Sequence, residues 1–195
     1  MTRIRFDGSE EKPLSQPLDC DPPENGATLA RFGGRSSEAG VAVRGMILSR
    51  PYRPEDMAGC LALFDSNTPR FFDASERESF VGFLGDQALR WPYQVIELDG
   101  RIVGCGGHAV EADGVSVALC WGMVDNSLHG QGLGRVLTEA RIAAARATPG
   151  IRRVILNTSQ HTQGFYARFG FEAEKVTPDG FAPGIDRWDM VLRLD

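Results

Sequence analysis

The segment Val124–Arg135, with the sequence VDNSLHGQGLGR, decides the fold of this chain. Three alternate glycines, Gly130, Gly132 and Gly134, lie between an apolar run and a run with helical periodicity. Glycine lets backbone N–H groups converge on an anion without a Cβ in the way, and the N-terminus of the following helix adds partial positive charge. The segment therefore predicts a cradle for the phosphates of a nucleotide or coenzyme.

Length and composition predict one globular domain, because the chain has 195 residues, is 42% hydrophobic and carries a formal charge of -5. Basic residues do not cluster with aromatic ones, which argues against a nucleic-acid partner. The chain lacks both an apolar run near the ~20 residues that span a bilayer and the layout of a secretion signal, so we expect a cytoplasmic protein without a membrane partner. The spacing of cysteines and histidines predicts no metal site and no disulfide scaffold. Reduced cysteines are expected, three of the four in the core: Cys20, Cys60, Cys105 and Cys120.

Composition changes near residue 43. The stretch 1–43 is rich in Pro, Gly and polar residues and shows no sustained apolar period. Such a stretch cannot bury enough surface to offset its ordering entropy, so it predicts a disordered N-terminal extension ahead of a folded domain over residues 44–195. With equal weight, the natural product begins near Met46.

Hydrophobic periodicity predicts the elements of the folded domain. Strands are expected at residues 46–49, 93–98, 102–110, 115–124, 151–156, 171–176 and 187–194. Helices are expected from Pro54, from Ser75, over residues 133–144, and from Thr158 or Ser159 to Phe169. The dipeptides Asp99-Gly100 and Asp113-Gly114 predict hairpins between the second, third and fourth strands.

Local signals support three of the helices. Ser75 and Glu78 have the spacing of a capping box, and Thr158 or Ser159 is the expected N-cap of the last helix. Arg135 and Glu139 are spaced to pair across one helical turn.

The order of these elements and two short motifs carry a family resemblance. The order is β-α-α-β-β-β-α-β-α-β-β, with the glycine segment between the fourth strand and the third helix. Residues 129–134 match the motif Gln/Arg-x-x-Gly-x-Gly/Ala except at His129, and residues 164–171, GFYARFGF, are similar to an FYxxxGF helix end. Residues from about 44 to 195 therefore resemble the GNAT superfamily of acetyl-CoA-dependent N-acyltransferases. The resemblance implies an α/β (α+β) fold with a mixed, mostly antiparallel central sheet of six to seven strands and about four helices.

The resemblance also implies an activity, which is transfer of an acetyl group from acetyl-CoA, as co-substrate, to a primary amine by direct attack in a ternary complex. Backbone amides would hold the coenzyme pyrophosphate at His129, Gly130, Gln131, Gly132, Leu133, Gly134 and Arg135. Tyr166 matches the family tyrosine that resembles a general acid for the coenzyme sulfur, and a phenol with a reference pKa of about 10 is still protonated at neutral pH. The alternative is that Tyr166 is simply buried beside Phe165 and Phe169.

In this family the strand before the glycine segment commonly bulges and separates from its neighbour, which exposes backbone groups to the pantetheine arm and the acyl oxygen. Met123 and Val124 occupy the matching positions and are expected to bind the coenzyme, and a backbone N–H, assigned to Met123, is expected to polarise the thioester carbonyl. Gly122 is compatible with a bulge, or it makes room for a neighbouring side chain.

A side-chain general base is not apparent. Several family members use a glutamate on the fourth strand, but residues 115–121 contain no carboxylate, and Asn157 stands near where others carry one on the fifth. Asp125 is expected to form a turn. Three groups stay open as bases acting through a water, each against an ordinary surface or hairpin role: Glu111, His108 and Asp186. An acceptor with a low pKa would need no base.

The acceptor is expected to be a small-molecule amine or a protein amine. Phe71, Phe72 and Trp121 are candidates to line its pocket, with core packing as the alternative for all three. His129 either adds charge to the phosphate site or is an exposed loop residue, and His161 is expected to face solvent. The protein is expected to be a monomer or homodimer, and the last two strands allow a dimer by strand pairing at apolar edge residues such as Met190 and Leu192.

Two other classes of function compete with this interpretation. A degenerate family member that binds acyl-CoA as a sensor or scaffold is compatible with the missing base. A dinucleotide-binding or P-loop domain is disfavoured, because Gly130, Gly132 and Gly134 lack the G-x-G-x-x-G spacing and no Gly-Lys-Ser/Thr follows them.

Overall fold

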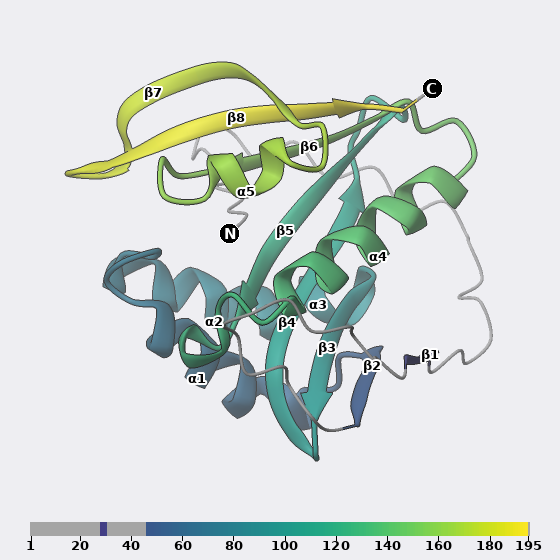
Figure 1. The fold of residues 1–195 in the computed structure, drawn as a ribbon, viewed down its shortest axis with the longest axis vertical. Coiled ribbons are helices and arrows are strands. Elements are labelled where there is room, and N and C mark those ends of the chain that lie inside the picture. The colour runs from purple at the N-terminus through teal and green to yellow at the C-terminus, as the bar shows by residue number, and fades with distance from the viewer. Residues whose placement is uncertain (1–27, 31–45, 195) are drawn as a thin grey trace, which may run out of the picture.

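The computed structural model describes residues 28–30 and 46–194, and their centre is one mixed sheet (Figure 1). The strand order is β1-β2-β3-β4-β5-β6-β8-β7, and β5 with β6 is the only parallel pair among the described strands. The strands are β1 (Thr28–Ala30), β2 (Ile47–Pro51), β3 (Tyr93–Leu98), β4 (Arg101–Val110), β5 (Ser116–Val124), β6 (Arg153–Thr158), β7 (Glu172–Ala182) and β8 (Ile185–Arg193).

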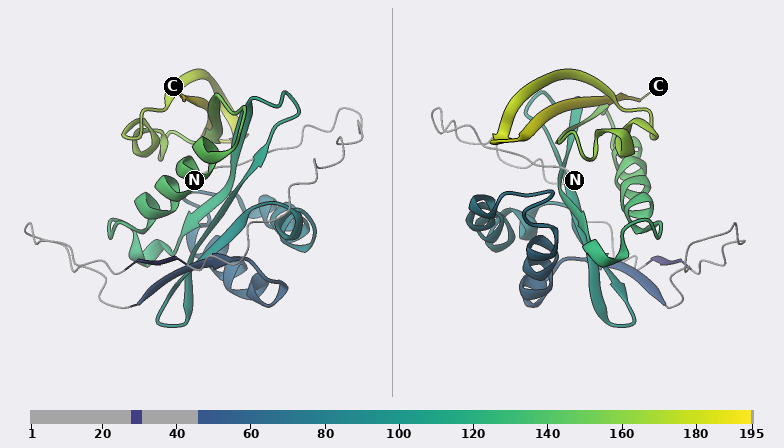
Figure 2. Two further views of the ribbon diagram at one scale, coloured as in Figure 1. Left: turned by 90° about the vertical axis from the view of Figure 1, so that its right-hand side faces the viewer. Right: turned by 60° about the vertical axis from the view of Figure 1, so that its left-hand side comes forward.

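Helices cover both faces of the sheet, with α1 and α2 on one face and α4 and α5 on the other (Figure 2). They are α1 (Met57–Asn67), α2 (Arg77–Gly85), α3 (Gln87–Arg90), α4 (Leu133–Ala147) and α5 (Gln163–Ala167). The expected α/β (α+β) class is confirmed, since β2 to β8 and α1, α2, α4 and α5 are the elements that the sequence predicts. Within the described residues, no helix is both long and apolar enough to cross a membrane.

The predicted N-terminal extension falls mostly outside the described residues, as does Cys20. The exception is Thr28–Ala30, which forms β1 and pairs with β2 through contacts such as Leu29 with Leu48. This short strand was not expected from the composition of the segment. The other three cysteines are free thiols in the core, as predicted: Cys60, Cys105 and Cys120.

Both predicted hairpins are present. Asp99 and Gly100 have φ values of 50° and 80°, the pair of positive angles that a two-residue type I′ turn requires between β3 and β4. In the turn between β4 and β5, Gly114 has a φ of 67°. The Asp113 carboxylate there accepts the N–H groups of Val115 and Ser116 at 2.9 and 2.8 Å.

The capping box before α2 differs from the predicted one. It joins Asp73 and Glu76, whereas Ser75 and Glu78 were expected. The Asp73 carboxylate accepts the Ser75 N–H at 2.9 Å, and the Glu76 carboxylate accepts the Asp73 N–H at 3.0 Å. The reason is a 3₁₀ turn at Ala74–Glu76 that starts the helical segment earlier, so its N-cap lies two residues upstream.

The start of α5 also corrects the prediction. Neither Thr158 nor Ser159 is the N-cap, which is Thr162. The Ser159 backbone carbonyl, and not its hydroxyl, accepts the N–H groups of Thr162 and Gln163, both at 3.0 Å. A backbone turn therefore takes the part that a capping side chain was expected to play.

Met190 and Leu192 are not the edge residues that the sequence predicted. Both residues lie on β8, which is paired with β6 on one side and β7 on the other. Their side chains are buried in the core beneath α4 and α5. A strand that is paired on both sides has no unpaired backbone groups with which a strand of a second chain could pair.

Candidate functional site

The site is built on the edge of β5 that faces β6. The two strands pair only over Ser116–Ala118 and Arg153–Ile155, and beyond these residues they diverge (Figure 1). From Leu119 to Val124 the backbone of β5 has β4 as its only strand partner among the described strands. We call the β6-facing side of this stretch the splayed edge.

A β-bulge distorts β5 within the splayed edge. Two residues of β5, Trp121 and Gly122, lie opposite the single residue Gly106 of β4, because the pairs on either side are Gly107 with Cys120 and Cys105 with Met123. Trp121 has a φ of 41°, in the left-handed region that bulges commonly use. The predicted bulge is therefore confirmed.

Gly122 has a second role, which was the alternative to the bulge. A Cβ on Gly122 would lie 2.5 Å from Nη1 of Arg141, and a Cβ on Gly106 would lie 3.1 Å from the same atom. The guanidinium of Arg141, a buried residue of α4, thus fills the space that two glycines leave on this face of the sheet. Both interpretations of Gly122 hold together.

The hydrogen-bond pattern at the end of β5 determines which backbone groups face the splayed edge. The Asp125 N–H donates to the Val103 carbonyl at 2.9 Å, while Val124 lies opposite Gly104. In an antiparallel ladder this makes Gly104 and Val124 a non-hydrogen-bonded pair, so the N–H and C=O of Val124 point away from β4. Met123 alternates with it and directs its own groups toward β4. Of the two residues expected to bind the coenzyme, Val124 is the one whose N–H faces the splayed edge. The assignment of Met123 as the polarising donor is therefore wrong, because its N–H is directed toward β4.

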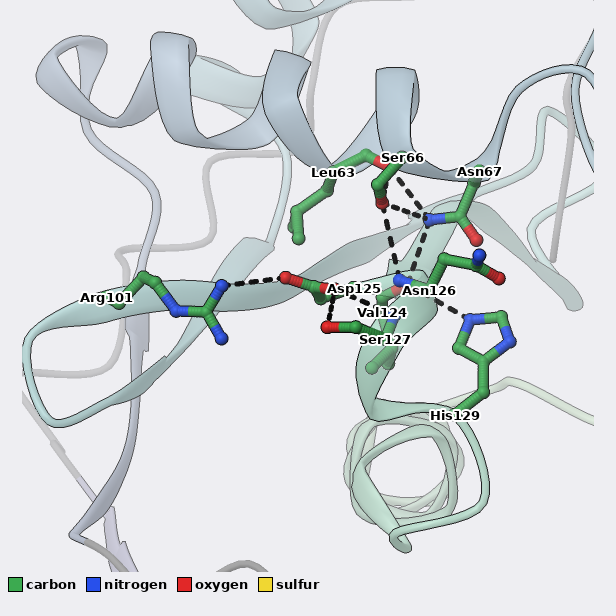
Figure 3. A network of polar contacts seen from close by, with 9 residues as sticks. All are labelled: Leu63, Ser66, Asn67, Arg101, Val124, Asp125, Asn126, Ser127 and His129. Carbon is green, nitrogen blue, oxygen red and sulfur yellow. Dashed lines mark hydrogen bonds and ion pairs between the residues drawn. The ribbon is translucent and has the colours of Figure 1, made fainter.

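The carbonyl of Val124 is held by two side chains (Figure 3). Asn67, at the end of α1, donates from Nδ2 at 2.9 Å, and His129 lies with Nε2 at 3.1 Å. Asn67 is buried and also donates to the Leu63 carbonyl at 2.8 Å. Because a carbonyl oxygen only accepts, these contacts place the hydrogen of His129 on Nε2 and fix the orientation of the Asn67 amide.

Polar contacts also anchor the segment between β5 and the glycines (Figure 3). The Asp125 carboxylate accepts the Ser127 N–H at 2.9 Å and pairs with Arg101 at 2.9 Å. Partial burial raises the pKa of Asp125, but the hydrogen bonds from Ser127 and the charge of Arg101 outweigh burial, so the pKa lies below its usual value. The expected role of Asp125 as a turn former is confirmed, and its carboxylate is engaged there.

The glycine segment leads directly into α4. Gly130 and Gly132 have φ values of 80° and 88°, and Gly132 is the N-cap of α4. The first intrahelical bond runs from the Val136 N–H to the Gly132 carbonyl, so the N–H groups of Leu133, Gly134 and Arg135 have no acceptor within the helix. A Cβ on Gly130 or Gly132 would meet no atom within 4 Å, so the space beside both is open.

Not every residue assigned to the cradle has a free N–H. The Gln131 N–H donates to the Leu128 carbonyl and the His129 N–H to the Asn126 carbonyl, each at 3.4 Å. The arrangement as a whole can receive an anion at the N-terminus of a 15-residue helix.

The second motif packs directly on the first. The ring of Phe165, on α5, lies 3.5 Å from where a Cβ of Gly134 would be. Tyr166 is 2% exposed, and its ring meets Phe165 and Phe171 edge-on with centroids 5.1 and 5.8 Å away. The structure therefore places Tyr166, the expected general acid, beside Phe165, which packs on the first turn of α4. Tyr166 is also buried, as the alternative interpretation predicted.

The three aromatic residues expected to line the acceptor pocket differ in their ring contacts. Phe72 and Trp121 belong to the core between the sheet and α1 and α2, with centroids 6.1 Å apart. The ring of Phe71 lies 5.3 Å from that of His129 and 6.4 Å from that of His161, between centroids. All three residues are buried in this core, and Phe71 in addition links the α1–α2 segment to the residues after β5 and after β6.

The candidate bases do not gather at the splayed edge. The Glu111 backbone N–H donates to the Ser116 carbonyl at the opposite end of β5. Ser116 is eight residues from Val124, so Glu111 lies roughly 25 Å from the end of the splayed edge. Burial, and secondarily Arg141, lower the pKa of His108 to about 4, which makes it a weak base. Asp186 accepts the Asp179 N–H at 3.1 Å beside the β7–β8 turn, and Asn157 donates to Asp189 on the neighbouring strand.

Sequence reasoning missed Asn67. Asparagine is common at the end of a helix, so the sequence gives Asn67 no special role. Its contact with Val124 joins residues 57 positions apart, which a local pattern does not reveal. Arg141 was missed because a charged residue in an amphipathic helix is expected on the exposed face.

Solved structures share the fold of this chain. A GNAT-family putative acetyltransferase from Desulfovibrio desulfuricans is 23% identical with a TM-score of 0.66, covering 75% of this chain and 98% of its own. An N-acetyltransferase from Staphylococcus aureus is 19% identical with a TM-score of 0.61, covering 76% and 99%. A putative acetyltransferase from Salmonella typhimurium, solved with its cofactor acetyl-CoA, is 20% identical with a TM-score of 0.60, covering 76% and 94%.

No curated protein matches the chain significantly. The acetyltransferase (GNAT) domain model matches residues 90–173, which include the splayed edge, the glycine segment and Tyr166. This part of the chain therefore matches the acetyltransferase (GNAT) domain model, and the chain shares the fold of solved GNAT acetyltransferases.

Proposed function

We propose that this protein transfers the acetyl group of acetyl-CoA to a primary amine by direct attack in a ternary complex. The observation that carries the proposal is the Val124 N–H, which faces the splayed edge a few residues before the N–H groups at the start of α4 that have no acceptor within the helix. Such an edge suits the amide-bearing pantetheine arm, and the cradle suits the pyrophosphate. Thioester and diphosphate are joined in one molecule, acetyl-CoA.

The residues of the chain would act on this substrate as follows. The N–H groups of Leu133, Gly134 and Arg135 hold the pyrophosphate, helped by the positive end of α4. The Val124 N–H donates to the thioester carbonyl oxygen, where negative charge develops during attack. In this assignment Val124 replaces Met123 as the polarising donor, because the N–H of Met123 is directed toward β4.

Tyr166 is proposed to protonate the departing thiolate. We expect Tyr166→Phe to lower kcat by about 10²- to 10⁴-fold while leaving the acetyl-CoA affinity unchanged, because phenylalanine keeps the ring packing and removes only the hydroxyl group that would donate the proton. Tyr52→Phe is the matched control, since the buried Tyr52 hydroxyl has no hydrogen-bond partner among the described residues. Equal rates for the two variants would remove Tyr166 from the mechanism.

The function itself is tested by calorimetry with acetyl-CoA and by a thiol-release screen against amino acids, polyamines, aminoglycosides and peptide N-termini. We expect binding, and release of free coenzyme A that depends on the amine. Binding without release for every amine would instead favour an acyl-CoA sensor or scaffold. Absence of binding would refute both.

A further inference from the structure

His129 is a titratable side chain at the splayed edge that the proposed function leaves unused. It occupies the first position of the glycine motif, where the family usually has glutamine or arginine. Its ring does not turn toward the phosphate cradle. It is hydrogen-bonded to the carbonyl of Val124 at the end of β5, with Nε2 and the oxygen 3.1 Å apart.

That hydrogen bond determines which nitrogen can accept a proton. The carbonyl oxygen only accepts, so Nε2 carries the hydrogen, and in the neutral ring Nδ1 is left with a free lone pair. Figure 3 shows the second ring nitrogen on the far side of the ring from Val124. The Val124 carbonyl therefore orients the imidazole and would also stabilise the imidazolium once Nδ1 is protonated.

The same residue places His129 beside the reacting centre. The N–H and C=O of one strand residue point to the same side, so the Val124 N–H shares the splayed edge with the carbonyl that binds His129. The ring of His129 also packs on Phe71, which in turn contacts His161 on the segment that follows β6. His129 thus lies where the divergent ends of β5 and β6 meet the α1–α2 segment.

Several charged or titratable groups face this ring. Burial is the main factor, and it lowers the pKa of His129. The positive charge of Arg70 lowers this pKa further, whereas the hydrogen bond to Val124 and the negative charge of Asp125 raise it. His161 lies beyond Phe71. Because the resulting pKa is below the usual 6.5, the imidazole is neutral at pH 7 and can accept a proton.

We propose that Nδ1 of His129 is the general base that deprotonates the acceptor ammonium, an inference that rests on the function proposed above. An N–H bond of the ammonium breaks, an Nδ1–H bond forms, and the freed lone pair attacks the thioester carbon. The carbon–sulfur bond then breaks, and the Tyr166 hydroxyl donates its proton to the departing thiolate. The nitrogen that has formed the amide bond still carries an extra proton, and it returns this proton to the Tyr166 oxygen. The imidazolium returns its proton to solvent.

The test compares two nucleophiles in His129→Gln. n-Butylamine is protonated at neutral pH and needs a base, whereas hydroxylamine is mostly unprotonated and does not. Glutamine retains an N–H donor for the Val124 carbonyl but cannot accept a proton as a base. We expect kcat/KM for n-butylamine to fall by about 10²- to 10⁴-fold, while that for hydroxylamine stays near the wild-type value.

His161→Gln is the matched control, because His161 also packs on Phe71 but has no bond to Val124. It should leave both rates unchanged. Acetyl-CoA calorimetry and thermal unfolding are measured on each variant, so that loss of coenzyme or of fold is distinguished from loss of the base.

The pH profile of the wild-type protein tests the proposal without any variant. A base is active when deprotonated, so kcat/KM for n-butylamine should fall as the pH drops through an apparent pKa below 6.5. The hydroxylamine rate is divided by the fraction of hydroxylamine that is unprotonated at each pH, and no limb should then remain. In His129→Gln the n-butylamine rate should follow only the fraction of free amine, without a break below pH 6.5. A wild-type profile without the limb, or an equal loss with both nucleophiles, would overturn the role of His129. Failure of the wild-type protein to release thiol with either nucleophile would instead count against the proposed function, and with it this inference.

Discussion

At the scale of single residues, Arg141 has the least ordinary environment in the described part of the chain. It is 3% exposed, and its Nε donates to the Leu137 carbonyl at 3.2 Å. Its Nη1 has no hydrogen-bond partner among the described residues. A buried cation without a carboxylate is costly, because the protein interior does not replace the hydration that the charge loses.

Replacing Arg141 by methionine should therefore stabilise the protein. We expect Arg141→Met to raise the free energy of unfolding by about 1–3 kcal/mol, measured by urea denaturation, because methionine fills the same space without a charge. Arg146→Met, an exposed site on the same helix, should change it by less than about 0.5 kcal/mol. Destabilisation by Arg141→Met would show that the guanidinium has a partner, such as an ordered water.

At the scale of elements, the contact between α4 and α5 joins the two sequence motifs into one site. Gly134, in the first turn of α4, faces the Phe165 ring at ordinary van der Waals distance from where its Cβ would be. Phe165 precedes Tyr166, so the position of α5 relative to the glycine segment depends on this contact.

Substitutions of graded size at Gly134 test that dependence. The contact at 3.5 Å leaves room for one methyl group, so Gly134→Ala should keep the acetyl-CoA affinity and the fold. Gly134→Val adds two further carbons that must displace Phe165, and we expect more than a tenfold loss of affinity, about 1.4 kcal/mol, by calorimetry. Equal affinities for both variants would show that α5 does not position the coenzyme.

At the scale of the whole molecule, the packing of the sheet against α4 makes stability depend on pH. His108 on β4 has its pKa lowered to about 4 by burial and, secondarily, by Arg141. In the unfolded chain its pKa is about 6.5, so between these values the unfolded state binds more protons. The contribution of His108 to stability is therefore complete above pH 6.5 and is lost as the pH falls toward 4.

This dependence can be measured by urea denaturation at pH 7 and pH 5. We expect the wild-type protein to lose about 2 kcal/mol more than His108→Gln over this interval, because only the wild-type protein has this histidine to protonate on unfolding. His161→Gln, at an exposed position, should behave as the wild-type protein. An equal loss in all three proteins would assign the acid sensitivity to other groups.

The order of the elements follows from signals that act over a few residues. The dipeptide Asp99-Gly100 predicts a hairpin turn because both turn positions need a positive φ. The glycines before α4 likewise predict a turn there, because glycine adopts positive φ without strain. The bulge at Gly122 was also predicted. Cap positions were less reliable, as Asp73 shows, because neighbouring polar residues offer several caps and the backbone path selects one.

The sequence by itself determined the resemblance to a family, the succession of strands and helices, and the glycine segment, because periodicity and backbone preference are local properties. Only the tertiary structure decided that Val124 faces the splayed edge, that Asn67 and His129 hold its carbonyl, and that Phe71 rather than Phe72 lies beside them. These facts depend on the divergence of β5 from β6 and on contacts between residues far apart in the chain. Such contacts are set by how the elements pack, which no short window of sequence specifies.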